Sequence, residues 1–160
     1  MQYCTIPSPV GELLLAGDAT GLWMVGFQDG THPTKPQPDW QEDPRPFKQA
    51  IAQLREYFAG ERREFDLTLA PEGTEFQLKV WSALRTIPYG KTWSYGELAR
   101  RIRKPKASRA VGAANGQNPI PIIVPCHRVI GADGSLTGFG GGLRIKRLLL
   151  ELESDVGSVF

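Results

Sequence analysis

The sequence lacks most of the features that would place a protein in a membrane, outside the cell or around a metal. Its longest apolar run, residues 119–125, is far shorter than the roughly 20 residues that cross a bilayer. The first residues do not combine a basic region with an apolar core, so no secretory signal is predicted. With two cysteines in 160 residues, a disulfide scaffold is not favoured, and we expect a cytoplasmic protein with reduced thiols.

Charge is distributed unevenly along the chain. Residues 1–70 carry six Lys and Arg against ten Asp and Glu, whereas residues 71–160 carry thirteen against seven. Between residues 91 and 115, seven basic side chains accompany a single acidic one, Glu97. A basic cluster of this kind suits a polyanion such as nucleic acid, although a charge run can also be the solvated face of a helix.

Residues 1–70 are predicted to form a small α/β domain. The elements expected are strands at 2–6, 12–18 and 22–28, a proline-rich loop at 29–46, a helix at 47–59 and a strand at 65–69. Apolar residues that recur from Phe47 at helical spacing indicate the helix, and alternate apolar residues from Phe65 indicate the last strand. His32, in the loop, is expected at the surface, and no catalytic cluster is apparent in this domain.

Residues 71–160 are predicted to form a second, mostly helical domain. Its helices are expected at 74–86, 95–102, 107–114 and 143–153. Capping boxes, Thr74 with Gln77 and Ser94 with Glu97, predict where the first two helices begin.

The two short helices at 95–102 and 107–114 are joined by a tight, basic turn, which is typical of a helix-turn-helix. The second helix consists largely of small residues and lacks a series of side chains that read base edges in the major groove. Small residues allow close approach to a minor groove or to a neighbouring helix, and Arg109 alone projects a long charged side chain. An ordinary helical hairpin is the alternative, and the basic residues favour DNA.

The segment 119–130 delivers a cysteine with a histidine directly behind it. Pro125 and the branched residues before it predict a buried, strand-like segment, which places Cys126 inside the protein. Burial makes a thiol a poor nucleophile unless a base acts on it, and His127 is the nearest candidate. A buried free cysteine is commonly only a small hydrophobe, and this segment alone does not decide between the two interpretations.

Three segments together resemble the O6-alkylguanine-DNA alkyltransferases, also called methylated-DNA–protein-cysteine methyltransferases. They are Ser94-Tyr95-Gly96-Glu97-Leu98-Ala99, Ser108-Arg109-Ala110-Val111-Gly112-Ala113-Ala114-Asn115, and the stretch from Asn118 to Gly131 that contains Pro125-Cys126-His127-Arg128-Val129. The resemblance runs from Thr74 to Glu153 and is weaker before it. It implies an α+β protein, with a ribonuclease H-like sheet and helix in residues 1–70. A winged-helix-like domain with a helix-turn-helix, in residues 71–160, would bind DNA and accept the alkyl group.

The resemblance implies DNA repair by direct, irreversible alkyl transfer, without a cofactor. The alkyl group of O6-alkylguanine, with O4-alkylthymine as a second substrate, would move to Cys126 once in the life of each protein molecule. His127 would act as base through a water, and Glu153 would orient its ring. Asn118 would organise the hydrogen bonds around the thiol, and the hydroxyl of Tyr95 would approach a ring nitrogen of the flipped base.

The resemblance also assigns the DNA contacts and the substrate pocket. Arg109 would occupy the space that the flipped nucleotide leaves, and Tyr95 would lie beside its phosphate. The other DNA-contacting residues implied are Ser94, Ser108, Ala110, Gly112 and Arg128. The guanine and its alkyl group would lie against Pro121, Phe139 and the backbone of Cys126, Val129 and Gly140. Phe139 stands where a tyrosine is common, which removes a hydroxyl and keeps the wall.

The partner expected from the resemblance is double-stranded DNA that contains O6-alkylguanine, with no membrane contact. The protein would be a monomer in solution that clusters cooperatively on DNA. Some relatives bind zinc in the first domain, but here that region offers only Cys4 and His32. A structural zinc site takes four ligands, so no metal is expected.

Three other functions fit these residues less well. A DNA-binding module without chemistry would not need Cys126, which is present. A cysteine hydrolase would need an oxyanion hole and would not need the basic helices. A transcription regulator would need base-reading side chains that the second short helix lacks.

Overall fold

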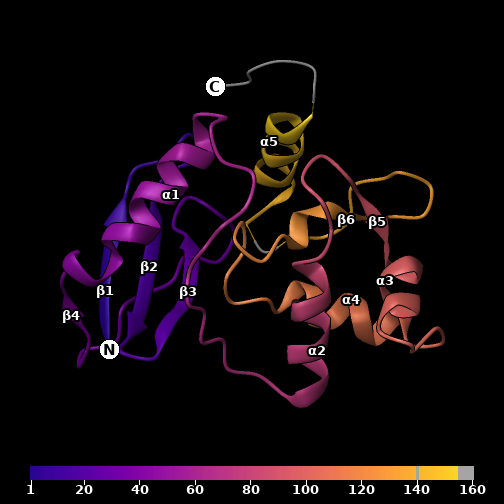
Figure 1. Cartoon of the computed structure of the whole chain (residues 1–160), viewed down its shortest axis with the longest axis horizontal. Helices are drawn as coiled ribbons and strands as arrows, with labels where there is room; N and C mark the ends of the chain where they lie inside the picture. Colours follow the sequence, from indigo (N-terminus) through magenta and orange to yellow (C-terminus); the bar gives the residue numbers. More distant parts are fainter. Residues whose placement is uncertain (140, 155–160) are drawn as a thin grey trace.

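The computed structural model describes residues 1–139 and 141–154, which form a sheet domain followed by a helical domain (Figure 1). The sheet contains β1 (Gln2–Ile6), β2 (Leu13–Asp18), β3 (Gly21–Phe27) and β4 (Gln41–Glu42), in the order β3-β2-β1-β4. Neighbouring strands are antiparallel except for β1 and β4, which are parallel. A short 3-10 helix, η1 (Arg45–Phe47), leads into α1 (Lys48–Phe58).

The central strand of the sheet is covered on both faces. The side chains from Leu13 to Ala16 in β2 are all fully buried, so the strand reads as an apolar run and not as an alternation. In α1, Ala50, Leu54 and Tyr57 bury their side chains in the same core. The first three predicted strands and the helix at 47–59 are therefore confirmed, apart from small shifts of their ends.

The predicted strand at 65–69 is wrong as an extended strand. The segment makes a single parallel bridge, between Leu22 and Leu69, and the ring of Phe65 packs against Tyr57 with centroids 5.5 Å apart. Its alternation of apolar residues thus reflects burial against the core and not pairing along a ladder. The fourth strand is instead β4, which is two residues long and lies within the segment predicted as a proline-rich loop.

The second domain contains four α-helices among its described residues, α2 (Glu75–Leu84), α3 (Tyr95–Arg101), α4 (Ser108–Gly116) and α5 (Leu143–Glu153). Thr74 and Gln77 form the predicted capping box of α2. Ser94 caps α3 by accepting a hydrogen bond from the backbone of Glu97, but the Glu97 carboxylate turns to Arg100 and Arg101 of its own helix. The helix-turn-helix is confirmed as two packed short helices.

Two short strands fasten the cysteine segment to these helices. β5 (Trp93–Ser94) pairs in parallel with β6 (Val129–Ile130), so the start of α3 lies beside the residues that directly follow Cys126. The two domains meet at the segment before it, where the backbone of Val25 in β3 donates to the carbonyl oxygen of Pro119 at 2.9 Å. Within residues 1–139 and 141–154, no helix has the length and apolar character needed to span a bilayer.

Candidate active site and DNA-facing surface

The segment before Cys126 is a buried turn, so the predicted strand-like conformation is wrong. The backbone of Val124 donates to the carbonyl oxygen of Ile120 at 2.9 Å, and Ile122 adopts a φ of 74°. Three prolines in this segment have no backbone N–H, which keeps it out of a sheet ladder. A branched residue in the left-handed region costs of order 1–3 kcal/mol, and here burial on all sides holds it there.

Asn118 clamps both ends of this turn. Its Oδ1 accepts a hydrogen bond from the backbone of Ile120 at 3.0 Å, and its Nδ2 donates to the carbonyl oxygen of Val124 at 2.8 Å. The chain then enters a 3-10 helix, η2 (Cys126–Arg128), whose first residue is the cysteine. The predicted role of Asn118 in the hydrogen bonds around the thiol therefore has a structural basis in the turn that presents the sulfur.

The Cys126 thiol lies in the wall of a cavity of about 250 Å³ that both domains line. Burial raises the pKa of Cys126 to about 11, although a hydrogen bond from Asn118 and the charge of Lys146 act in the opposite direction. The thiol is thus protonated at neutral pH and needs a base before it can attack. The remaining residues around the cavity include Met24, Phe27, His32, Asn115, Pro121 and Phe139.

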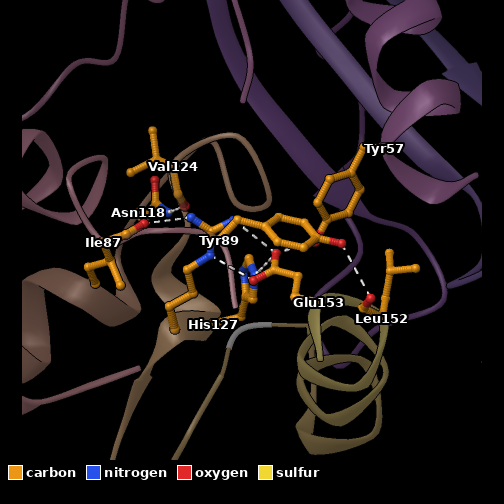
Figure 2. A network of polar contacts seen from close by, with 9 residues as sticks. Tyr57, Ile87, Tyr89, Asn118, Val124, His127, Leu152 and Glu153 are labelled. Carbon is orange, nitrogen blue, oxygen red and sulfur yellow. Dashed lines mark hydrogen bonds and ion pairs between the residues drawn. The ribbon is translucent and has the colours of Figure 1, made fainter. Parts of the chain in front are cut away.

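His127, which directly follows Cys126 in the chain, forms a buried pair with Glu153. Nε2 of His127 lies 2.7 Å from Oε2 of Glu153, and both side chains are almost wholly buried. Figure 2 shows the two side chains meeting where the end of α5 reaches the cysteine segment. The distance confirms the predicted contact between an imidazole and a carboxylate at the end of the last helix.

The Glu153 carboxylate is ionised at neutral pH. Burial raises its pKa, but the charges and hydrogen bonds of His127 and Arg128 outweigh burial and hold the pKa of Glu153 at about 2. An ionised carboxylate fixes the imidazole with Nε2 as the donor, which leaves the lone pair on Nδ1. Nδ1 of His127 is buried and has no hydrogen-bond partner among the described residues. This nitrogen is therefore the ring atom of His127 that no described residue engages.

The assignment of Arg128 to the DNA surface is contradicted by its burial. Only 6% of the residue is exposed, and Nε and Nη2 contact the two carboxylate oxygens of Glu153 at 2.7 and 3.0 Å. Nη1 donates to the carbonyl oxygen of Ile87, and the guanidinium stacks over the ring of Tyr89. Arg128 is the counter-ion of the Glu153 carboxylate, because a buried carboxylate without a partner would be costly.

Two buried polar residues of the site were missed by the sequence interpretation. Lys146 of α5 is fully buried, and its Nζ donates to the carbonyl oxygens of Val129 and Thr137 at 2.6 and 3.2 Å. Asn115 of α4 lines the cavity and has no hydrogen-bond partner for its buried Oδ1 among the described residues. Neither residue stands out in the sequence, because each lies in an apolar helical pattern that indicates core.

The predicted pocket residues divide into three groups. Pro121 and Phe139 line the cavity, and Phe139 packs against Phe27 of the sheet domain with ring centroids 5.6 Å apart. Val129 is fully buried beneath the site, and its carbonyl oxygen accepts a hydrogen bond from Lys146. Gly140 lies outside the described residues, so its predicted contact with guanine stays a prediction.

The predicted DNA-contacting residues other than Arg128 gather around α3 and α4. Arg109 and Ala110 are exposed at the start of α4, and Ser108 is half-buried there. The ring of Tyr95 lies against Gly112, where an added Cβ would come within 3.6 Å of it. The small size of Gly112 thus accommodates a neighbouring helix residue, one of the two alternatives left open by the sequence. The Tyr95 hydroxyl shares a hydrogen bond with Thr137.

Five of the seven basic side chains between residues 91 and 115 remain available for a polyanion. Arg100 and Arg101 pair with Glu97, whereas the other five make no ion pair with any described residue. Four of these five lie in or beside the turn between α3 and α4 and are exposed. These four, called the basic turn below, are Arg103, Lys104, Lys106 and Arg109.

The cysteines and histidines do not converge on a metal. Cys4 and Cys126 are both buried and free, and His32 is exposed, as predicted. Within the described part of the chain, no group of three His, Cys, Asp or Glu residues is arranged to hold a metal ion.

Comparison with known proteins gives consistent matches over both domains. The model of the ribonuclease-like domain of 6-O-methylguanine DNA methyltransferase matches residues 1–71, and the model of the DNA binding domain matches residues 75–155. A methylated-DNA–protein-cysteine methyltransferase of Methanosarcina acetivorans is 57% identical over 155 residues, which cover 97% of this chain and 99% of that protein.

Solved structures agree with these matches. The crystal structure of Mycobacterium tuberculosis OGT in complex with DNA is 53% identical in sequence and superposes with a TM-score of 0.92, covering 99% of this chain and 96% of the other. An O6-methylguanine-DNA methyltransferase from Pyrococcus kodakaraensis is 25% identical, with a TM-score of 0.66 over 94% of this chain and 98% of the other. The predicted α+β fold, with a ribonuclease-like domain before a helical DNA-binding domain, is confirmed.

Proposed function

The chain belongs to the 6-O-methylguanine DNA methyltransferase family, and we propose that Cys126 is the residue onto which it moves the alkyl group. The matches confirm the family predicted from sequence. The protein repairs DNA by direct alkyl transfer from O6-alkylguanine to one of its own cysteines. The assignment of Cys126 as the acceptor rests on the structure around its thiol. Its buried thiol lines a cavity, and the adjacent His127 is polarised by Glu153.

The transfer uses the lone pair that Glu153 leaves on Nδ1 of His127. The thiol proton of Cys126 passes through a water to Nδ1, and the sulfur attacks the alkyl carbon as the carbon–O6 bond breaks. The electron pair of that bond stays on guanine, whose ring nitrogen takes a proton from the Tyr95 hydroxyl. Tyr95 regains a proton from solvent and His127 releases the thiol proton to solvent, so one hydrogen in total moves from the thiol to guanine. The product is a thioether, which does not hydrolyse readily, so each molecule acts once. O4-alkylthymine offers the same kind of bond and is proposed as a second substrate.

A buried thiol can meet the damaged base only if the nucleotide leaves the duplex. Arg109 is proposed to fill the space that the flipped nucleotide leaves, because it is the long exposed side chain at the start of α4. The exposed Ala110 lets the helix approach the groove closely. The backbone and hydroxyls of Ser94 and Ser108, at the starts of α3 and α4, are proposed to contact phosphates.

The assignment of the cysteine is tested with duplex DNA that carries O6-methylguanine labelled in its methyl group. Wild-type protein is expected to take up at most one equivalent of label, found on Cys126 by peptide mass spectrometry, and C126A none. C4A is the matched control, because Cys4 is the other buried cysteine and its pKa is also raised to about 11 by burial. Label that persists in C126A, or release of product beyond one equivalent, would contradict the proposal.

We further propose that the protein is a monomer in solution, clusters cooperatively on DNA and acts in the cytoplasm. Monomeric state and clustering rest on the family resemblance alone. The cytoplasm is supported by the two free cysteines, since a reducing compartment preserves an acceptor thiol.

A further inference from the structure

One contact to the catalytic carboxylate comes from the first domain. Tyr57 lies near the end of α1, is fully buried, and donates its hydroxyl hydrogen to Oε2 of Glu153 at 2.5 Å. Figure 2 shows Tyr57 entering the network from the side of the sheet domain, whereas Leu152 and Glu153 come from the end of α5. The two residues are 96 positions apart in the chain, so neither domain alone contains the pair.

The direction of this hydrogen bond follows from the charges around it. Burial, together with the negative charge of Glu153, raises the pKa of Tyr57 well above 10, so the phenol keeps its proton. Glu153 is ionised and can only accept. The oxygen that receives the phenol hydrogen, Oε2, is also the oxygen that contacts His127 at 2.7 Å and Nη2 of Arg128 at 3.0 Å.

Packing fixes where this hydroxyl points. The ring of Tyr57 makes edge contacts with Phe58 and Tyr89, at centroid distances of 5.3 and 6.3 Å, and a tilted contact with Phe65 at 5.5 Å. A ring held from several sides loses little further freedom when its hydroxyl binds a carboxylate. Outer partners held in this way set the orientation of the groups they contact.

We propose that Tyr57 is a positioning residue for alkyl transfer, through which the first domain holds Glu153 in the orientation that leaves Nδ1 of His127 free to act as base. The inference rests on the proposed function of Cys126 and adds to it a role for α1 in the chemical step. Tyr57 is not among the residues that line the cavity, so its proposed action is through the carboxylate.

The test compares Y57F with Y3F. Phenylalanine keeps the aromatic packing at Tyr57 and removes only the hydroxyl. Tyr3 is the matched control, because its hydroxyl also lies beside a glutamate, Glu42, but far from the site along the sheet. Single-turnover methyl transfer is measured with duplex DNA and with free O6-methylguanine base, below the melting temperature of the least stable variant. DNA affinity is measured separately.

Y57F is expected to slow transfer by about tenfold, the size expected for loss of one hydrogen bond to a charged group, while Y3F reacts like wild type. The loss should be similar with duplex DNA and with free base, and DNA affinity should not change. Wild-type rates in folded Y57F, or a loss confined to DNA binding, would overturn the inference. Absence of label on wild-type Cys126 would instead defeat the proposed function.

A spectroscopic measurement separates positioning from general destabilisation. The chain has two histidines, so protein labelled with ¹⁵N-histidine gives ring signals from His127 and His32 only. Y57F should shift the ring nitrogens of His127 and leave those of His32 in place, and Y3F should shift neither. Unchanged His127 signals in Y57F would overturn the inference even if the variant reacts slowly.

Discussion

At the scale of single residues, Glu153 is the centre of the site. Its carboxylate accepts hydrogen bonds from Tyr57 and Arg128 and contacts His127. A buried carboxylate is costly unless its oxygens are paired and hydrogen-bonded, and a partly satisfied network is worse than an apolar one. These partners stabilise the ionised form, which in turn fixes the tautomer of the imidazole. The structural role of Glu153 and its proposed catalytic role therefore depend on the same contacts.

This coupling predicts how stability depends on pH. The pKa of Glu153 is depressed from 4.5 to about 2 in the folded protein. Its contribution to the free energy of unfolding is therefore complete above about pH 4.5 and is lost as pH falls towards 2. In E153Q the buried Arg128 loses its partner, and the expected cost at pH 7 is about 3–5 kcal/mol.

The measurement is urea unfolding of wild type and E153Q between pH 7 and pH 3. The difference in free energy between the two proteins should be constant down to about pH 5 and then shrink. Depressed carboxylates elsewhere, such as Asp43 and Glu97, occur in both proteins and cancel in the difference. A difference of equal size at pH 7 and pH 3 would show that the pKa of Glu153 is not depressed in the folded state.

The same residues show how far sequence alone could go. Cys126, His127 and Glu153 were predicted because the segment around the cysteine resembles a known family, and the structure brings the last two together. Arg128 was placed wrongly because an arginine within a family motif of a DNA-binding protein suggests a phosphate contact. Tyr57 was not predicted, since its partner lies 96 residues away and α1 reads only as an apolar helix face.

At the scale of elements, the helices with clear start signals were the most predictable. α2 begins at its capping box, and α5 has the predicted bounds, 143–153. The turn before Cys126 was not predictable, because branched residues favour strands and only Asn118 and the prolines oppose that tendency. The strand β4 is short and pairs by register with distant β1, which no local pattern reveals.

The contact between α3 and α4 predicts that G112A is stabilising. The added Cβ would meet the ring of Tyr95 at 3.6 Å, an ordinary contact distance, and alanine is favoured over glycine in a helix by about 1 kcal/mol. G21A is the contrasting variant, because Gly21 has a φ of +142° and its Cβ would lie 2.7 Å from the carbonyl oxygen of Thr68. Thermal unfolding should give a higher melting temperature for G112A and a lower one for G21A. A lower value for G112A would mean that the two helices pack more tightly than this contact indicates.

At the scale of the whole molecule, charge and chemistry are divided between two domains that share one site. The sheet domain carries the acidic excess and supplies Met24 and Phe27 to the cavity wall. The helical domain carries the basic excess, the thiol and the basic turn. The charge asymmetry favours the approach of the helical domain to a polyanion. The sheet domain contacts the Glu153 carboxylate through Tyr57.

This division predicts which lysines govern the salt dependence of DNA binding. Each phosphate contact contributes about 0.9 to the slope of log affinity against log salt, so the double variant K104Q/K106Q in the basic turn should reduce the slope by about 1.8. The control is K35Q/K48Q, which removes the same charge from exposed positions of the sheet domain. Binding to undamaged duplex, measured by fluorescence anisotropy from 50 to 300 mM salt, separates the two. Equal slopes for both double variants would mean that the net charge of the protein, and not the basic turn, drives its attraction to DNA.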